Sequence, residues 1–214
     1  MLSRWINSNE GIITPDKYMK DVESGMEIYW LTEQLIRDGV QVLKEIQATD
    51  KSCGLSFNLS SKIVADTRII NKITEYFNNA SINHSTVTFE ITESAYMYYP
   101  NIALKNIQKL FSLGFNISLD DFGTGYTSYS YIKNMKLNEI KIDKSFIHGI
   151  RDSKVNQTIV KNILHLSKEL GLQSCAEGIE TEDDYLFLKK MGCDIGQGFF
   201  WSKPIPYKEA LKLI

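Results

Sequence analysis

The stretch Val87–Asp121, VTFEITESAYMYYPNIALKNIQKLFSLGFNISLDD, contains a complete strand–helix–strand unit. Val87–Thr92 packs apolar and β-branched residues into a short window, which predicts a strand. Pro100 opens a segment whose apolar residues recur three and four positions apart, which predicts a helix, and Gly114 ends it. Phe115–Asp120 predicts a second strand. Two strands joined by a helix are typical of parallel pairing in an α/β protein.

The same alternation of short strand-like runs and longer helical periods continues from about residue 50 to the end of the chain. Six strands are predicted, at Gly54–Leu59, Val87–Thr92, Phe115–Asp120, Glu139–Asp143, Leu172–Ala176 and Ile195–Trp201. The helices between them carry end signals, such as the acidic first turn after Thr181 and the terminal Gly192. The first fifty residues instead predict two helices, one opening at Thr14 and a longer one over about 27–46, and only Met1–Ile6 could form a strand there.

Length and composition narrow the class of protein. The 214 residues carry 24 Lys plus Arg against 26 Asp plus Glu, so the net charge of −2 gives no electrostatic reason to expect DNA or RNA as a partner. A mean hydropathy of −0.21 and the lack of a long apolar run predict neither a membrane span nor a signal peptide. Three scattered cysteines predict reduced thiols and a cytoplasmic location. No Pro- or Ser-rich linker divides the chain, so we expect one domain over residues 1–214.

Polar side chains gather near the ends of the predicted strands. They are Asn58, Glu90, Asp120, Asp121, Lys141, Glu177 and Gln197. In a barrel of alternating strands and helices the carboxyl ends of the strands meet at one mouth, so these groups could converge there. Carboxylate and amide oxygens select Mg²⁺ or Mn²⁺. Adjacent Asp120 and Asp121 could serve two ions, which favours hydrolysis of a phosphodiester.

Two of these residues then have natural chemical roles. Lys141 could neutralise a phosphate or orient the attacking water, and Glu177 could take up a proton or bind the second metal. No histidine lies near these strand ends, so a histidine base is disfavoured.

Each residue also has a purely structural interpretation. A single carboxylate at a strand end is more often a helix cap or an ion-pair partner than a metal ligand, and Glu93, Asp143 and Glu180 fit either role. The glycines of the loop at 121–126 could relieve a tight turn or cradle a phosphate. A further set of large aromatic residues is expected to form core or pocket wall, namely Tyr29, Trp30, Phe199, Phe200 and Trp201.

Taken together, the motifs resemble those of the EAL domain family of cyclic di-GMP phosphodiesterases. The matching segments are Asn58-Leu59-Ser60, Glu90-Ile91-Thr92-Glu93, Asp120-Asp121-Phe122-Gly123-Thr124-Gly125-Tyr126, Lys141-Ile142-Asp143, Ala176-Glu177-Gly178-Ile179-Glu180 and Gln197-Gly198. The resemblance covers essentially the whole chain and implies a modified TIM (β/α)₈ barrel. It implies cleavage of one phosphodiester of cyclic di-GMP to linear pGpG, a reaction of bacterial signalling, with two Mg²⁺ or Mn²⁺ ions per site.

The resemblance also implies roles for individual residues. Asn58, Glu90 and Asp120 would bind the first metal, and Asp120 would bridge to a second metal held by Asp121 and Glu177. Lys141 would lie beside the nucleophilic water, and Glu177 is also a candidate general base. Substrate contacts are implied for Arg4, Asp121, Glu180 and Gln197, and Glu93 would steady the loop after Asp121.

The chain departs from the family pattern at its beginning. Met1-Leu2-Ser3-Arg4-Trp5 stands where the family has Glu-Ala-Leu-Leu-Arg-Trp. Arg4 is kept, but the glutamate, which is a metal ligand in the family, would precede Met1. The family's first helix and about two strands would precede it too, so we expect an incomplete barrel.

Three functions remain open at this point. In an excerpt of a longer polypeptide, the domain would be a phosphodiesterase, commonly a homodimer fused to a sensory domain, whose parent could be tethered to the inner membrane. With Met1 as the true start, an impaired EAL domain would act as a cyclic di-GMP receptor or a protein-binding regulator. The third possibility is a gene fragment that does not fold stably alone.

Overall fold

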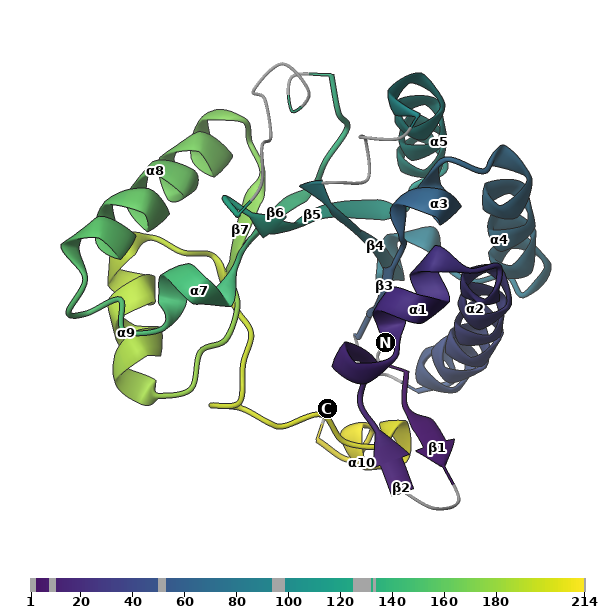
Figure 1. The fold of residues 1–214 in the computed structure, drawn as a ribbon, viewed down its shortest axis with the longest axis horizontal. Coiled ribbons are helices and arrows are strands. Elements are labelled where there is room, and N and C mark those ends of the chain that lie inside the picture. The colour runs from purple at the N-terminus through teal and green to yellow at the C-terminus, as the bar shows by residue number, and fades with distance from the viewer. Residues whose placement is uncertain are drawn as a thin grey trace.

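The computed structural model describes residues 3–7, 11–49, 53–93, 99–124, 132 and 134–213 (Figure 1). Six parallel strands, adjacent in chain order, form one sheet that curls into an open half-barrel with helices on its outside. The strands are β3 (Leu55–Asn58), β4 (Val87–Thr92), β5 (Asn116–Phe122), β6 (Glu139–Ile142), β7 (Gln173–Ala176) and β8 (Ile195–Gly196). Within the described ranges, the structure therefore confirms the α/β class and the incomplete barrel, because closure needs eight strands.

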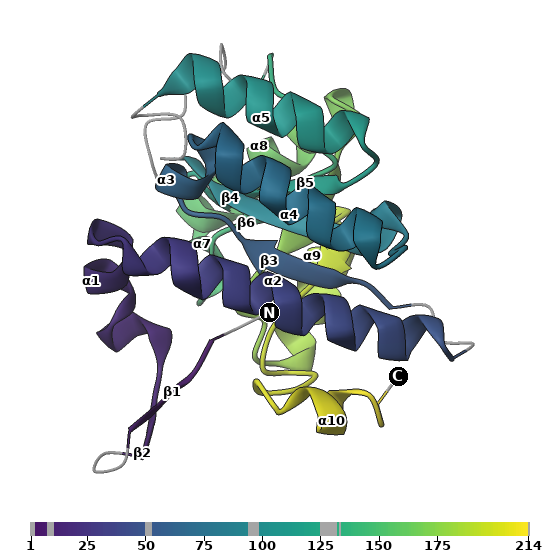
Figure 2. The same ribbon diagram turned by 90° about the vertical axis from the view of Figure 1, so that its right-hand side faces the viewer.

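Helices alternate with the strands of the sheet along most of the chain, and the longer ones cover its outer face. They are α1 (Met19–Ser24), α2 (Glu27–Gln47), α3 (Ser61–Val64), α4 (Thr67–Asn79), α5 (Pro100–Ser112), α7 (Lys144–Ile147), α8 (Lys154–Glu169), α9 (Glu182–Met191) and α10 (Tyr207–Ala210). Figure 2 shows α2, α4 and α5 stacked over one side of the half-barrel. Their end signals work as predicted: the Thr181 hydroxyl accepts a hydrogen bond from the Asp184 amide, and Gly192 ends α9 with a φ of 93°. None of the helices in the described ranges is long and apolar enough to cross a bilayer.

The two faces of the sheet differ in polarity. In β4, Val87, Phe89 and Ile91 are buried and belong to the hydrophobic core under the helices, where the Phe89 ring contacts Phe77 of α4. The alternate positions, which include Glu90, point to the concave face. In β4, apolar packing is therefore confined to the convex face, and the concave face carries polar groups.

Two of the sequence-based strand predictions need correction. The predicted strand Ile195–Trp201 ends at Gly196, because the chain turns away to bond Ile179: the Ile179 amide donates to the Gln197 carbonyl at 3.1 Å. Gln197 therefore follows β8 and does not lie within it. The predicted strand Met1–Ile6 is replaced by β1 (Trp5–Asn7), which pairs antiparallel with β2 (Gly11–Ile13) in a hairpin outside the sheet (Figure 2).

The predicted burial of the large aromatic side chains is wrong in part. Trp30, Phe199 and Trp201 are exposed at 70%, 55% and 50%. Trp30 lies on α2 outside the buried stripe that includes Ile28 and Ile36, because a helix presents only one face to the core. Phe200 is also exposed, although its ring stacks against Tyr185 of α9.

We expect Asn106→Ala to destabilise the protein by about 1–3 kcal/mol, because a buried carbonyl would lose its hydrogen bond. Asn106 of α5 is buried, and its side-chain amide donates to the Val64 carbonyl at 2.8 Å while its oxygen accepts from the Thr67 hydroxyl. Urea unfolding would measure the change. Asn101→Ala, on the exposed face of the same helix, is the control; equal stability losses in the two variants would contradict the assignment.

Glu33 ties α2 to α4, and we expect Glu33→Gln to cost about 1 kcal/mol at pH 7. Its carboxylate accepts from Lys72 at 2.7 Å and from the Tyr76 hydroxyl at 2.6 Å, and these bonds lower the pKa of Glu33 from 4.5 to about 2. The stabilisation is complete above the unfolded-state pKa and fades as the pH falls from 4.5 towards 2. The difference between wild type and variant should therefore be smaller at pH 3 than at pH 7.

Urea unfolding at pH 7 and pH 3 would measure this difference, with Glu75→Gln on the exposed face of α4 as the control. A difference between wild type and Glu33→Gln that does not change with pH would show that the charge of Glu33 contributes nothing.

Candidate active site

A buried lysine at the carboxyl ends of the strands organises the candidate site. Lys141 of β6 is 3% exposed, and its Nζ atom lies 3.2 Å from Glu90 Oε1, 3.2 Å from Asp120 Oδ1 and 2.5 Å from Glu177 Oε1. The three carboxylates come from β4, from β5 and from the residue after β7. Parallel pairing makes this possible, because it brings the carboxyl ends of neighbouring strands to one edge of the sheet. The sequence-based prediction that these residues converge is confirmed geometrically.

Burial and the neighbouring charges change the acidity of these groups. Burial alone would lower the pKa of Lys141, but the attraction of Glu90, Asp120 and Glu177 outweighs it and raises the pKa, so the lysine is an ammonium ion. Burial raises the pKa of Glu177 to about 7, against the opposing attraction of Lys141, and repulsion from Asp120 adds to the increase. Glu177 can therefore accept and release a proton near neutral pH.

A local distortion of β5 turns two successive carboxylates towards the site. Side chains normally alternate between the faces of a sheet, but the pairing of β5 with β6 shifts register between Leu119 and Phe122. Asp121 has a φ of 54°, in the left-handed region that is unfavourable for a non-glycine residue, and its amide donates to Asp120 Oδ1 at 3.1 Å. Such strain persists only where the surroundings enforce it, and it often marks functional sites.

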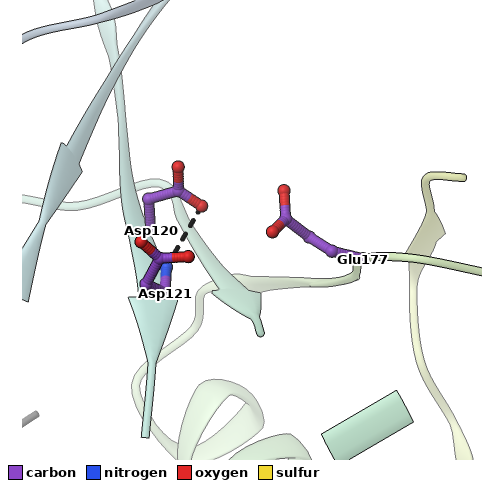
Figure 3. Close-up of side chains that lie close together, drawn as sticks. All are labelled: Asp120, Asp121 and Glu177. Atoms are coloured by element: carbon purple, nitrogen blue, oxygen red, sulfur yellow. Dashed lines mark hydrogen bonds between the residues drawn. The ribbon is translucent and has the colours of Figure 1, made fainter. Parts of the chain in front are cut away.

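Asp120, Asp121 and Glu177 form a group that could hold a metal ion. One carboxylate oxygen from each lies within 4.8 Å of the others, and Figure 3 shows the two aspartates facing Glu177 across a gap. Burial and repulsion from Asp120 raise the pKa of Asp121, so the group concentrates negative charge that a cation would relieve. Hard oxygen donors in this number suit Mg²⁺ or Mn²⁺.

The carboxylates open into a cavity of about 370 Å³. Asn58, Glu90, Asp120 and Asp121 line one side of it. Asn58 reaches this position because it pairs in register with Glu90 across β3 and β4. The other side is formed by α1, α2 and residue Ser3 of the N-terminal segment. The cavity therefore combines a negatively charged end with a largely apolar wall.

Glu93 supports the backbone that follows Asp121. Its Oε1 atom accepts a hydrogen bond from the Gly123 amide at 2.7 Å, while its Oε2 atom is buried without a hydrogen-bond partner in the described part of the chain. Gly123 has a φ of 99°, and a Cβ there would lie 2.9 Å from the Phe146 ring. The loop prediction extended to Tyr126, but residues 125–131 lie outside the described ranges.

Three of the remaining predicted residues, Glu180, Gln197 and Arg4, lie at the periphery. Glu180 and Gln197 are exposed, and the Gln197 amide donates to the Ala176 carbonyl, which places it beside the strand that carries Glu177. The Arg4 guanidinium is exposed and donates to the Ser3 carbonyl at 2.7 Å. Asp143 caps α7 by accepting from the Ser145 amide at 2.9 Å, as the structural interpretation predicted.

Two features of the site are not predicted from the sequence: the wall formed by α1 and α2, and the carboxyl group of Glu139. Glu139 accepts a hydrogen bond from the Ser118 hydroxyl at 2.6 Å, and burial raises its pKa. Its signal was present, since it lies two residues before Lys141 and therefore on the same face of β6. The contribution of α1 had no comparable signal, because it depends on how the first helices pack against the sheet.

Comparison with known proteins relates this geometry to enzymes of cyclic di-GMP turnover. The chain is 28% identical to the Pseudomonas aeruginosa cyclic di-GMP phosphodiesterase NbdA over 96% of its length and 31% identical to the Escherichia coli cyclic di-GMP phosphodiesterase PdeR over 99%. It spans 26% and 33% of those relatives.

Solved structures agree in fold. The PaMucR phosphodiesterase in complex with c-di-GMP superposes with a TM-score of 0.92 at 30% identity, covering 98% of this chain and 85% of that one. An EAL domain protein from Listeria monocytogenes superposes with a TM-score of 0.82 at 26% identity, covering 99% and 83%. The family model of the EAL domain matches residues 1–204, which include every residue of the carboxylate cluster, so the chain belongs to the EAL domain family.

Proposed function

We propose that this protein hydrolyses cyclic di-GMP to linear pGpG. The observation that carries the proposal is the convergence of Glu90, Asp120 and Glu177 on Lys141 at the mouth of the half-barrel, beside a cavity. Relatives named as cyclic di-GMP phosphodiesterases, and the c-di-GMP complex of a similar domain, support the choice of substrate. The catalytic unit would be a single domain that includes residues 1–214.

The donor set would hold two Mg²⁺ or Mn²⁺ ions, because carboxylate and amide oxygens are the ligands that these cations prefer. Asn58, Glu90 and Asp120 would hold the first, and Asp120, Asp121 and Glu177 would hold the second. When bound, the ions would activate water as a nucleophile and stabilise the charge that develops on the phosphoryl group.

Two side chains would assist the reaction: Glu177 would take up a proton, and Lys141 would stabilise negative charge on the phosphate. Water oxygen attacks phosphorus, one phosphodiester P–O bond breaks, and the ring of the cyclic dinucleotide opens. Glu177 is the candidate general base that would accept the proton of the attacking water, and the leaving oxygen would take a proton from solvent. The Lys141 ammonium would stabilise negative charge on the phosphate without moving a proton, because its pKa is raised.

Asp121 and residues at the periphery of the site would hold the substrate. Asp121, Glu180, Gln197 and Arg4 are proposed to contact cyclic di-GMP, which for Arg4 requires that its exposed guanidinium turn towards the cavity that its neighbour Ser3 already lines. Glu93 would keep the segment after Asp121 in place through its bond to Gly123. We also propose that the protein forms a homodimer and that the domain belongs to a longer parent chain with a sensory domain.

Glu177→Ala and Asp120→Asn should each reduce the conversion of cyclic di-GMP to pGpG at least about 100-fold, because each removes a group that acts on the reacting centre. The assay would follow pGpG by chromatography with Mg²⁺ or Mn²⁺ present, using the longest natural polypeptide that contains these residues. Asp152→Asn, an exposed acidic residue outside the site, is the control.

Full activity in either variant would contradict the proposed mechanism. Calorimetry separates the alternative functions: a wild-type protein that binds cyclic di-GMP without turnover would be a receptor. A protein with neither binding nor turnover would leave only the protein-binding regulator.

Lys141→Met should make folding depend strongly on a divalent cation, because it leaves three close carboxylates without their neutralising charge. Removing one partner of a buried ion pair costs roughly 3–5 kcal/mol. We expect a large loss in Tm in the presence of a chelator and a larger Mn²⁺-induced rise in Tm than in wild type. Thermal melts of Lys141→Met and of the exposed control Lys136→Met would measure this.

A response to Mn²⁺ that is equal in wild type and Lys141→Met would show that the ion binds elsewhere. Asp121→Asn offers a second check of the metal site. It removes one carboxylate ligand and keeps Lys141, so it should reduce the Mn²⁺-induced rise in Tm.

A further inference from the structure

Lys62 joins α3 to the carboxyl end of α1, and both segments contribute residues to the lining of the cavity. It belongs to α3, four residues after Asn58, and its Nζ atom donates to the Ser24 carbonyl at 2.5 Å and to the Gly25 carbonyl at 3.3 Å. These carbonyls stand at the carboxyl end of α1, where a helix leaves acceptors without partners and carries partial negative charge. The Lys62 ammonium donates hydrogen bonds to these acceptors, and its positive charge also offsets the partial negative charge of the helix end.

Helix α1 has few other means of staying in place. It is six residues long, well below the length at which an isolated helix is stable in water, and none of its residues is fully buried. Met19 and Val22 pack against the core only in part. Its position therefore depends on a small number of contacts, of which the two bonds from Lys62 connect the end of α1 to α3.

The position of α1 matters because it lines the cavity that contains the carboxylates. Met19 and Glu23 of α1 face the same cavity as Asn58 and Asp120. A molecule held at the carboxylates and large enough to fill the cavity must touch α1. Movement of α1 would change how well such a molecule fits but would leave the carboxylates and Lys141 where they are.

We propose that Lys62 is a positioning residue that fixes α1 as a wall of the substrate cavity and thereby sets the affinity for cyclic di-GMP. The inference rests on the proposed function for the identity of the substrate. Lys62 does not touch the reacting atoms, so its contribution is to binding and not to the chemical step. The site and α3 are also close along the chain. Asn58, which lines the cavity, is the last residue of β3, and α3 begins three residues later at Ser61.

The experiment compares Lys62→Met, which keeps the aliphatic stem and removes the ammonium, with Lys62→Arg, which restores a cation. Lys105→Met, on the exposed face of α5, is the matched control. Hydrogen exchange of the amides of residues 19–25 reports on α1 without any need for activity. Steady-state kinetics with cyclic di-GMP reports on substrate fit.

In Lys62→Met we expect exchange in residues 19–25 to be about tenfold faster, because local opening becomes easier. KM should rise about three- to tenfold while kcat changes less than about twofold. This pattern is expected when a variant weakens binding of the substrate and of the transition state to the same extent. Lys62→Arg should recover most of both effects, and Lys105→Met should show neither.

Unchanged exchange in α1 would overturn the inference, and so would faster exchange with an unchanged KM. A fall in kcat at constant KM would also overturn it, because it would place Lys62 in the chemical step. A wild-type protein that neither binds nor cleaves cyclic di-GMP would refute the proposed function instead, and the exchange measurement would then decide alone whether Lys62 holds α1.

Discussion

The structure of the candidate site depends on one buried ammonium group. Three carboxylates within about 3 Å of Lys141 Nζ would repel one another strongly in an environment largely removed from water, and the lysine makes their convergence tolerable. This buried cluster of charges stabilises the protein less than apolar side chains of the same volume would. Its presence despite this loss of stability points to a function. It also leaves the carboxylates with an excess of negative charge, which divalent cations can neutralise.

The backbone makes this cluster possible through two features. Successive side chains along a strand point to opposite faces of the sheet, so in β4 Phe89 and Ile91 build the core on the convex face while Glu90 reaches the concave one. The register shift in β5 then breaks the alternation, and Asp121 adopts a left-handed conformation beside Asp120. An unstrained strand would direct only one of these two aspartates towards the site.

Much of the fold and of the site could be predicted from the sequence, for physical reasons that differ by region. The strand that carries Glu90 was predicted with its observed bounds, because a buried parallel strand leaves a compact apolar signal, and the polar residues at strand ends stood out against it. β8 could not be delimited, because its end depends on bonds between Gln197 and Ile179, which are distant in sequence. The exposure of Trp201 and the role of α1 depend in the same way on tertiary packing.

The central claim is that acidic and amide side chains from separate strands bind divalent cations that act on cyclic di-GMP. Anomalous diffraction from crystals grown with Mn²⁺ and cyclic di-GMP tests it most directly. We predict anomalous peaks among Asn58, Glu90, Asp120, Asp121 and Glu177, with a phosphate of the nucleotide next to them. A bound nucleotide with no peak at these side chains, or peaks only at other positions, would contradict the account.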